Sequence, residues 1–148
     1  MPKKKTSAPP AGTKITQSEW EVMRVLWDAN VPLPAAEIAA RLEGKADWSP
    51  RTVRTFLNRL VQRQSVKAIK QKIWGYELLH FVPLIDEATA LQAKQETFAQ
   101  KFFGGTIHSM LVGCIRSGEI STEKLLQLRE MIDQQVKEQK NQKGGKLP

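Results

Sequence analysis

The chain has 148 residues, a net charge of +8 and one cysteine, Cys114. This length suits one domain of ordinary size or a small domain with an appended helical segment, and a single cysteine excludes an intrachain disulfide. No stretch approaches the roughly 18 consecutive apolar residues of a membrane-spanning helix, and no apolar block follows the N-terminal lysines as it does in a secretory signal. We therefore expect a cytoplasmic protein without membrane insertion, with a disordered basic arm over residues 1–14.

The positive charge is concentrated in the first 82 residues. They hold 14 Lys and Arg against 7 Asp and Glu, whereas residues 83–148 hold 9 against 8. No acid lies between Asp47 and Glu77. Such an interval indicates polyanion binding, because each phosphate that a cation neutralises releases condensed counterions. The alternative, a merely solvated basic face, usually has acids interspersed.

Capping and breaking signals predict two helices in the first 44 residues. Thr16 and Glu19 have the spacing of a capping box and open a helix over residues 17–29. Pro34 suits a first helical position and Gly44 suits a helix end, which predicts a second, shorter helix between them.

A third helix is predicted from Ser49 as N-cap and Pro50 at the first helical position, to about Gln64. Its apolar residues recur at steps of three and four, so one face should pack. The other face offers types that read bases, since arginine can bind guanine, asparagine can bind adenine and threonine can contact the thymine methyl group. The candidates for base readout are Arg51, Thr52, Arg54, Thr55 and Asn58. The candidates for phosphate contacts are Ser49, Arg59, Arg63, Lys70 and Lys72.

Two strand-like segments follow, SVKAIK and WGYELLHF, which predict a hairpin joined by Gln71, Lys72 and Ile73 with a basic tip. We expect His80 to form a hydrogen bond at the surface. Two helices, a basic helix and a two-stranded wing are the order of a winged helix-turn-helix domain, here over residues 15–82. The expected fold class is mainly α with a small β-hairpin, and the third helix should enter the major groove.

Residues 83–138 predict three helices with apolar faces, the first with a stripe from Leu84 to Phe102. Few residues are left to cover these faces, so we expect a homodimer formed by this region. The residues expected at the dimer interface are Leu91, Phe98, Phe102, Met110, Leu111, Leu125, Leu128 and Ile132. The polar and glycine-containing residues 139–148 predict a disordered tail.

Nothing in the chain predicts an enzyme, a cofactor or a metal site. His108 and Cys114 are six residues apart, which places them on nearly opposite sides of a helix. We expect Cys114 to be a small core residue rather than a redox sensor. There is no nucleotide-binding glycine loop and no recognisable nucleophile or acid/base pair.

The strings ITQSEWEVMRVLW, PLPAAEIAARL and DWSPRTVRTFLNRLV, followed by a hairpin and FVPLIDE, resemble the penicillinase repressor (BlaI/MecI/CopY-type) family of bacterial transcription factors. The resemblance runs from about Ile15 to Gln135. It implies a homodimer that binds a palindromic DNA operator through winged-helix domains and dimerises through C-terminal helices, with repression relieved by a signal. It also implies that Ser49 to Arg59 form the recognition helix.

The chain departs from this family where a signal would be received. Penicillinase-type members are cut by a membrane-anchored sensor protease at an Asn-Phe bond, and the matching region here is Gly113-Cys114, with no Asn-Phe pair in the chain. This departure argues against a sensor protease as partner. Copper-responsive members carry Cys-x-Cys motifs that this chain lacks. Many relatives have a glycine after the recognition helix, where Gln64 and Ser65 stand here.

Three hypotheses follow for the function. The leading one is a sequence-specific, dimeric DNA-binding repressor of transcription. The second is a nonspecific architectural nucleoid-binding protein, which the basic arm and the threonine-rich reading face suggest. The third is a winged-helix module that binds proteins and does not bind DNA.

Overall fold

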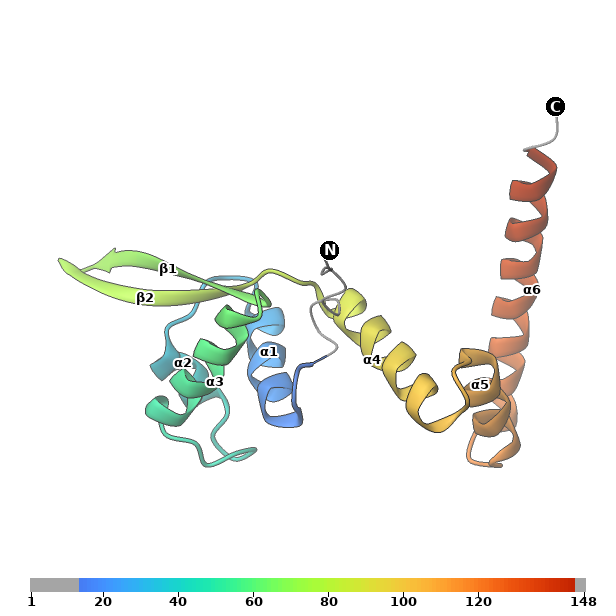
Figure 1. Cartoon of the computed structure of the whole chain (residues 1–148), viewed down its shortest axis with the longest axis horizontal. Helices are drawn as coiled ribbons and strands as arrows, with labels where there is room; N and C mark the ends of the chain where they lie inside the picture. The colour runs from blue at the N-terminus through green and yellow to red at the C-terminus, as the bar shows by residue number, and fades with distance from the viewer. Residues whose placement is uncertain (1–13, 146–148) are drawn as a thin grey trace, which may run out of the picture. The chain divides into compact units, whose positions relative to one another are not determined.

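The computed structural model describes residues 14–145, which form six helices and one antiparallel two-stranded sheet (Figure 1). The predicted N-terminal arm, apart from Lys14, lies outside the described residues. Two compact units divide between Phe98 and Ala99, inside the fourth helix. The elements in chain order are α1 (Gln17–Ala29), α2 (Ala35–Arg41), α3 (Pro50–Gln62), β1 (Val66–Ile73), β2 (Tyr76–Pro83), α4 (Glu87–Phe102), α5 (Ile107–Arg116) and α6 (Thr122–Gly145).

The starts of the first two helices follow from local capping. Thr16 Oγ1 accepts a hydrogen bond from the Glu19 amide at 3.2 Å, and Glu19 Oε1 accepts one from the Thr16 amide at 3.1 Å, so the predicted capping box is confirmed. The prediction for Pro34 is wrong by one position. Pro34 has an extended backbone and is the N-cap of α2, because its carbonyl accepts from the amides of Glu37 and Ile38, both at 3.1 Å.

The first unit has a hydrophobic core to which every element from α1 to the start of α4 contributes. Full burial of one large aliphatic side chain stabilises a fold by about 1.5–3 kcal/mol, so a core of this kind can hold the unit together without covalent links. Its fully buried members include Val22, Met23, Leu26, Ile38, Leu42, Val53, Leu57, Leu60, Val66 and Phe81.

The hairpin is longer at its outer end than the sequence suggested. β1 and β2 pair from Val66 opposite Pro83 to Ile73 opposite Tyr76, so the connection is Trp74-Gly75. Both connecting residues have positive φ, 56° and 83°, which is the conformation of a two-residue hairpin turn with the right-handed twist of the strands. The predicted connection through residues 71–73 is therefore wrong, and Trp74 rather than a lysine lies at the tip.

The base of the hairpin is joined to the loop between α1 and α2. Leu33 forms a one-residue antiparallel bridge with Phe81 in β2. The Leu33 amide donates to the Phe81 carbonyl at 3.2 Å, and the Phe81 amide donates to the Leu33 carbonyl at 2.8 Å. The sequence predicted only a helix break at this place, because one bridging residue leaves no alternating pattern.

The fourth helix begins later than predicted and buries a different face. Asp86 caps it by accepting from the Thr89 amide at 3.1 Å, and Leu84 lies before it. The residues buried along α4 are small, Ala90, Ala93 and Ala99, whereas the predicted stripe of larger apolar residues is exposed. Small side chains allow a helix to approach its neighbours closely. The sequence pattern did not predict this alanine face, because the larger apolar residues form the more obvious stripe.

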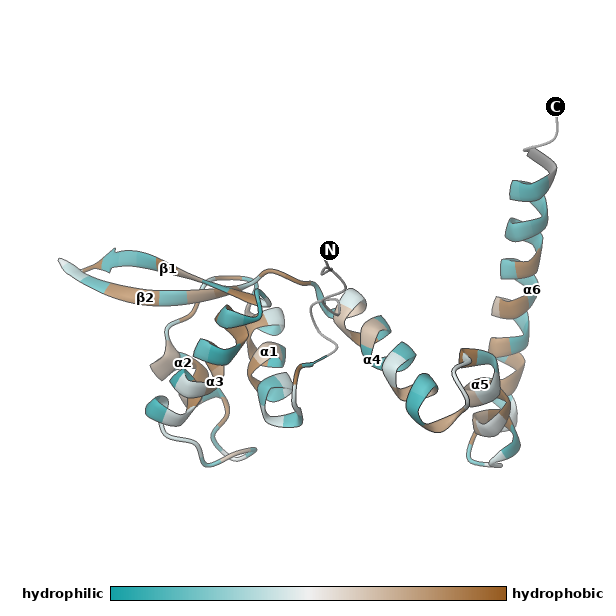
Figure 2. Cartoon of the chain, in the orientation of Figure 1, coloured by the Kyte–Doolittle hydropathy of each residue, from teal (hydrophilic) through white to brown (hydrophobic). Residues whose placement is uncertain are grey.

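In the second unit, hydrophobic residues gather over α5 and the first half of α6 (Figure 2). α6 continues to Gly145, so the prediction of a disordered tail from residue 139 is wrong for the part that the structure describes. Glutamine, lysine and glutamate are good helix formers, and Gln134 Nε2 donates to Glu138 Oε1 at 3.4 Å one turn further on. Within residues 14–145, no helix is long and apolar enough to cross a membrane.

Candidate nucleic-acid interface

The third helix, α3, has two chemically distinct faces. Ser49 Oγ accepts from the Thr52 amide at 3.2 Å and caps the helix, and Pro50 occupies the first helical position, as predicted. Val53, Leu57 and Leu60 are fully buried on one face. The opposite face is exposed and consists of Arg51, Arg54, Thr55, Asn58 and Arg59. The helix is thus fixed to the core by one side and presents polar and basic groups on the other.

The two threonines of the reading face already form hydrogen bonds within the helix. Thr55 Oγ1 donates to the Arg51 carbonyl at 3.2 Å, and Thr52, which is half-buried, has its hydroxyl 3.2 Å from Ser49 Oγ. Neither Arg51 nor Arg54 forms an ion pair with any residue between 14 and 145. The arginines are therefore better placed than the threonine hydroxyls to donate to an external acceptor.

Arg63 is an internal ion-pair partner, so its prediction as a phosphate contact is corrected. Its Nη1 and Nη2 donate to Glu19 Oε1 and Oε2 at 2.6 and 2.9 Å, and Nη1 also donates to the Lys14 carbonyl at 2.8 Å. Glu19 is fully buried. Because three guanidinium bonds are satisfied inside the unit, Arg63 stabilises the packing of α3 on α1 instead of offering its charge to a ligand.

The same ion pair sets the protonation of Glu19. Burial by itself would raise the pKa of this carboxyl group, but hydrogen bonds from Arg63 and Thr16 outweigh it and hold the pKa below its ordinary value. Glu19 is therefore ionised near neutral pH. The sequence pattern could not reveal the pair, because its partners lie 44 residues apart.

The chain leaves α3 through a residue with a left-handed backbone. Gln64 has φ of 62°. It follows the recognition helix, where the family resemblance implies a glycine in many relatives. The Ser65 amide then donates to the Leu60 carbonyl at 2.9 Å, and the Ser65 carbonyl accepts from Leu84 at 2.9 Å. The strained residue thus lies between two well-bonded segments, the end of α3 and the base of the hairpin.

The exposed lysines of the hairpin lie on two faces. Successive residues of a strand alternate between faces, and Val66 and Phe81 are buried on the face that covers the core. Lys70 and Lys72 share that face further out, beyond the core, whereas Lys67 lies on the other face. β1 also packs against α3, so the base of the hairpin lies beside that helix.

Two expectations for single side chains are wrong. His80 is buried, at 4% exposure, with Nδ1 3.1 Å from the Leu78 carbonyl oxygen, because the base of β2 is covered on both faces. Cys114 is exposed rather than part of a core. Among residues 14–145, no three His, Cys, Asp or Glu side chains lie close enough to hold a metal ion.

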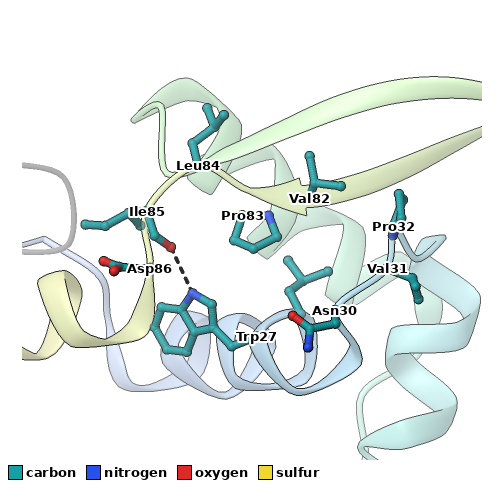
Figure 3. Close-up of a pocket in the computed structure, with 10 residues that line it drawn as sticks. Trp27, Asn30, Val31, Pro32, Val82, Pro83, Leu84, Ile85 and Asp86 are labelled. Carbon is teal, nitrogen blue, oxygen red and sulfur yellow. Dashed lines mark hydrogen bonds between the residues drawn. The ribbon is translucent and has the colours of Figure 1, made fainter.

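A pocket of about 500 Å³ lies in the first unit, between the end of α1 and the segment that follows β2 (Figure 3). Trp27 Nε1 donates to the Ile85 carbonyl at 2.9 Å along one side of it. Val31, Pro32 and Pro83 supply apolar walls, and Asp86 lies at the end near α4. The sequence pattern gave no signal for a pocket, because its wall combines residues around the end of α1 with residues around the end of β2.

A helix-turn-helix with a basic, exposed third helix and a β-hairpin beside it defines the winged-helix class. The family described as Penicillinase repressor matches residues 15–134. The chain belongs to this family of repressors, as its sequence motifs indicated.

Curated relatives span most of the chain. The penicillinase repressor of Bacillus licheniformis is 28% identical over 130 residues, which cover 88% of this chain and 94% of the relative. The methicillin resistance regulatory protein MecI of Mammaliicoccus sciuri is 23% identical over 81% of this chain and 94% of its own length. The penicillinase repressor of Staphylococcus aureus is also 23% identical, over 81% of this chain and 91% of its own.

Proposed function

We propose that this protein is a sequence-specific transcriptional repressor that binds a palindromic operator as a homodimer. The observation that carries the proposal is α3, whose apolar face is fully buried and whose opposite face presents exposed basic and amide side chains. A helix fixed in this way can enter a major groove with its side chains already positioned. The similarity to a penicillinase repressor and to a methicillin resistance regulatory protein supports the repressor role.

In this proposal, base contacts and phosphate contacts are made by different residues of the surface. Arg51, Arg54 and Asn58 contact base edges, and Thr52 and Thr55 lie at the flanks, where a methyl group can contact thymine. Phosphate contacts fix the orientation of the helix on the duplex. They come from Arg59, Lys70 and Lys72, and from the N-terminal end of α3 at Ser49.

The homodimer is supported by apolar side chains exposed along α4, α5 and α6. Phe102 is 67% exposed, Leu111 53% and Ile132 55%. Leu91, Phe98 and Leu128 are also exposed, whereas Met110 and Leu125 are half-buried within the chain. Apolar surface of this extent on a single chain is typical of an interface, and a second copy of the same chain brings the same surface to it.

The test is a salt-titrated binding assay on the promoter region of the protein's own gene. Specific repressors bind their sites about 10³-fold or more tightly than nonspecific DNA, so the full-length chain should prefer this fragment to its scrambled counterpart by at least about a thousandfold. Equal affinities for the two duplexes would indicate the architectural alternative. Retention of neither duplex would indicate the protein-binding module.

A further inference from the structure

The tip of the hairpin carries an aromatic residue in an unfavourable conformation. Trp74 is 94% exposed and has φ of 56°. The first position of such a two-residue turn ordinarily holds asparagine, aspartate or glycine, because the left-handed conformation brings a larger residue's Cβ close to its own backbone. Trp74 therefore contributes neither buried apolar surface nor a relaxed backbone conformation to the stability of the fold. An outlier of this kind is a reason to look for a binding role.

The position of the tip relates it to α3. Eight residues in each strand carry the turn about 25 Å from the base of the hairpin. In Figure 1 the turn and the N-terminal end of α3 lie on the same side of the first unit. Lys70 and Lys72 lie between the core and the tip, on the face of the hairpin that continues the core side.

The chemistry around the indole favours nucleic acid over protein or lipid. Glu77 is the only acid of the hairpin strands, and it is paired in register with Lys72. The flat, apolar indole ring with lysines nearby is complementary to a DNA groove, because the groove is lined by deoxyribose and bordered by phosphates. The minor groove of B-DNA is about 6 Å wide, which admits an indole edge-on, and apolar side chains are known to enter it.

We propose that Trp74 is a DNA-contacting residue whose indole occupies the minor groove beside the major-groove site of α3. The inference rests on the proposed DNA-binding function and adds a second, minor-groove contact to it. The cost of holding a tryptophan in this turn is offset by contact with deoxyribose when DNA is bound. Because the minor groove narrows in A·T-rich sequence, the contact would make affinity depend on the composition of the flanks as well as on the bases that α3 reads.

The test compares Trp74→Asn with the wild-type chain on two probes, a duplex selected by the wild-type chain from a random pool and a scrambled duplex. Asparagine suits the left-handed turn, so the variant should melt no lower than the wild type. Its affinity for the selected duplex should fall by roughly tenfold or more, the size expected for loss of an aromatic contact to a nucleotide. Trp74→Phe should retain most of the affinity.

A matched control and footprints locate the contact. Tyr76 is 77% exposed and lies next to the turn on the face opposite Lys70 and Lys72, so Tyr76→Asn should leave affinity almost unchanged. Hydroxyl-radical protection of flanking sugars should disappear in Trp74→Asn, while methylation protection of major-groove guanines should persist. Unchanged affinity and footprint in Trp74→Asn, or an equal loss in Tyr76→Asn, would overturn the inference. Selective binding by the wild type would still uphold the proposed function in either case.

Discussion

The two units of this chain differ in what their apolar residues contact. In the first unit, large side chains such as Met23, Leu57 and Phe81 are almost completely buried. In the second unit, Phe102, Met131 and Ile132 are each more than half exposed. The two sets are similar in chemical type. They differ in whether other residues of the same chain bury them.

This difference indicates how the two units gain stability. A unit with its own core can fold independently of concentration, whereas a unit that leaves its apolar faces in water gains stability from a partner and depends on protein concentration. Disrupting the internal contacts of the first unit should therefore lower its stability at any protein concentration, whereas disrupting the exposed faces of the second unit should change association.

The largest expected effect concerns the buried ion pair. Arg63→Ala leaves the carboxylate of Glu19 buried without its partner, and removal of one member of a buried pair costs about 3–5 kcal/mol. Urea unfolding of the purified variant measures this loss. A variant that keeps wild-type stability but shows a smaller salt slope of DNA binding would restore Arg63 as a phosphate contact. Adding Glu19→Gln to Arg63→Ala should recover part of the loss.

The same pair predicts acid sensitivity. The pKa of Glu19 is lowered in the folded chain, so the folded state binds fewer protons than the unfolded state in the interval between the two pKa values. Its stabilisation is present above the ordinary glutamate pKa of about 4.3 and is lost as pH falls through the lower folded value. Unfolding midpoints measured from pH 7 to pH 3 should therefore fall less steeply in Glu19→Gln than in the wild type.

The next effect concerns the exposed face of α6. Ile132→Glu places a charge on the proposed dimer interface and should weaken association by about 2–4 kcal/mol, the range of a central interface residue. Sedimentation velocity at several concentrations measures it. Gln127→Glu is the matched control, because it adds the same charge at a polar position of the same helix. If Ile132→Glu remains as dimeric as this control, the proposed interface is elsewhere.

A smaller effect on DNA binding distinguishes base contacts from phosphate contacts. Arg54→Ala should cost roughly 1–3 kcal/mol on the selected duplex and relax preference at one base position, whereas Lys72→Ala should weaken all duplexes alike and reduce the salt slope by about one. Competition binding at several salt concentrations distinguishes the two. The assignment of Arg54 to a base is lost if its variant weakens selected and scrambled duplexes equally.

The smallest effect is a gain in stability. Gln64 has a left-handed backbone, so Gln64→Gly should relieve strain and raise the free energy of unfolding by about 0.5–1 kcal/mol. Thermal melting of the two proteins checks this. Gln62→Gly, inside the last turn of α3, is the control and should instead lower stability. A loss in both variants would show that the left-handed residue at 64 is not strained.

The parts of the fold that could be predicted from sequence depend on local signals. The capping box at Thr16, the Ser49-Pro50 helix start and the period of Val53, Leu57 and Leu60 each involve residues within one or two helical turns, and the structure confirms all of them. Local rules suffice there because neighbours in sequence are neighbours in space.

The errors arose where distant segments or an unusual turn determine the outcome. The exposed face of α3 could be predicted from periodicity, but the role of Arg63 depends on Glu19 in another helix. The hairpin turn was misplaced because Trp74 does not resemble a turn residue, although the glycine that follows it was the available signal. The base and phosphate assignments on α3 and the hairpin stay predictions.

The bridge between Leu33 and Phe81 has a consequence for how the first unit would search along DNA. Two backbone hydrogen bonds join the loop between α1 and α2 to the base of β2. The base of the hairpin is therefore held to the helices before any ligand arrives. A surface with such fixed spacing meets a duplex as one rigid template, so a single base pair inserted between the regions contacted by α3 and by the hairpin should prevent the two regions from being occupied at the same time.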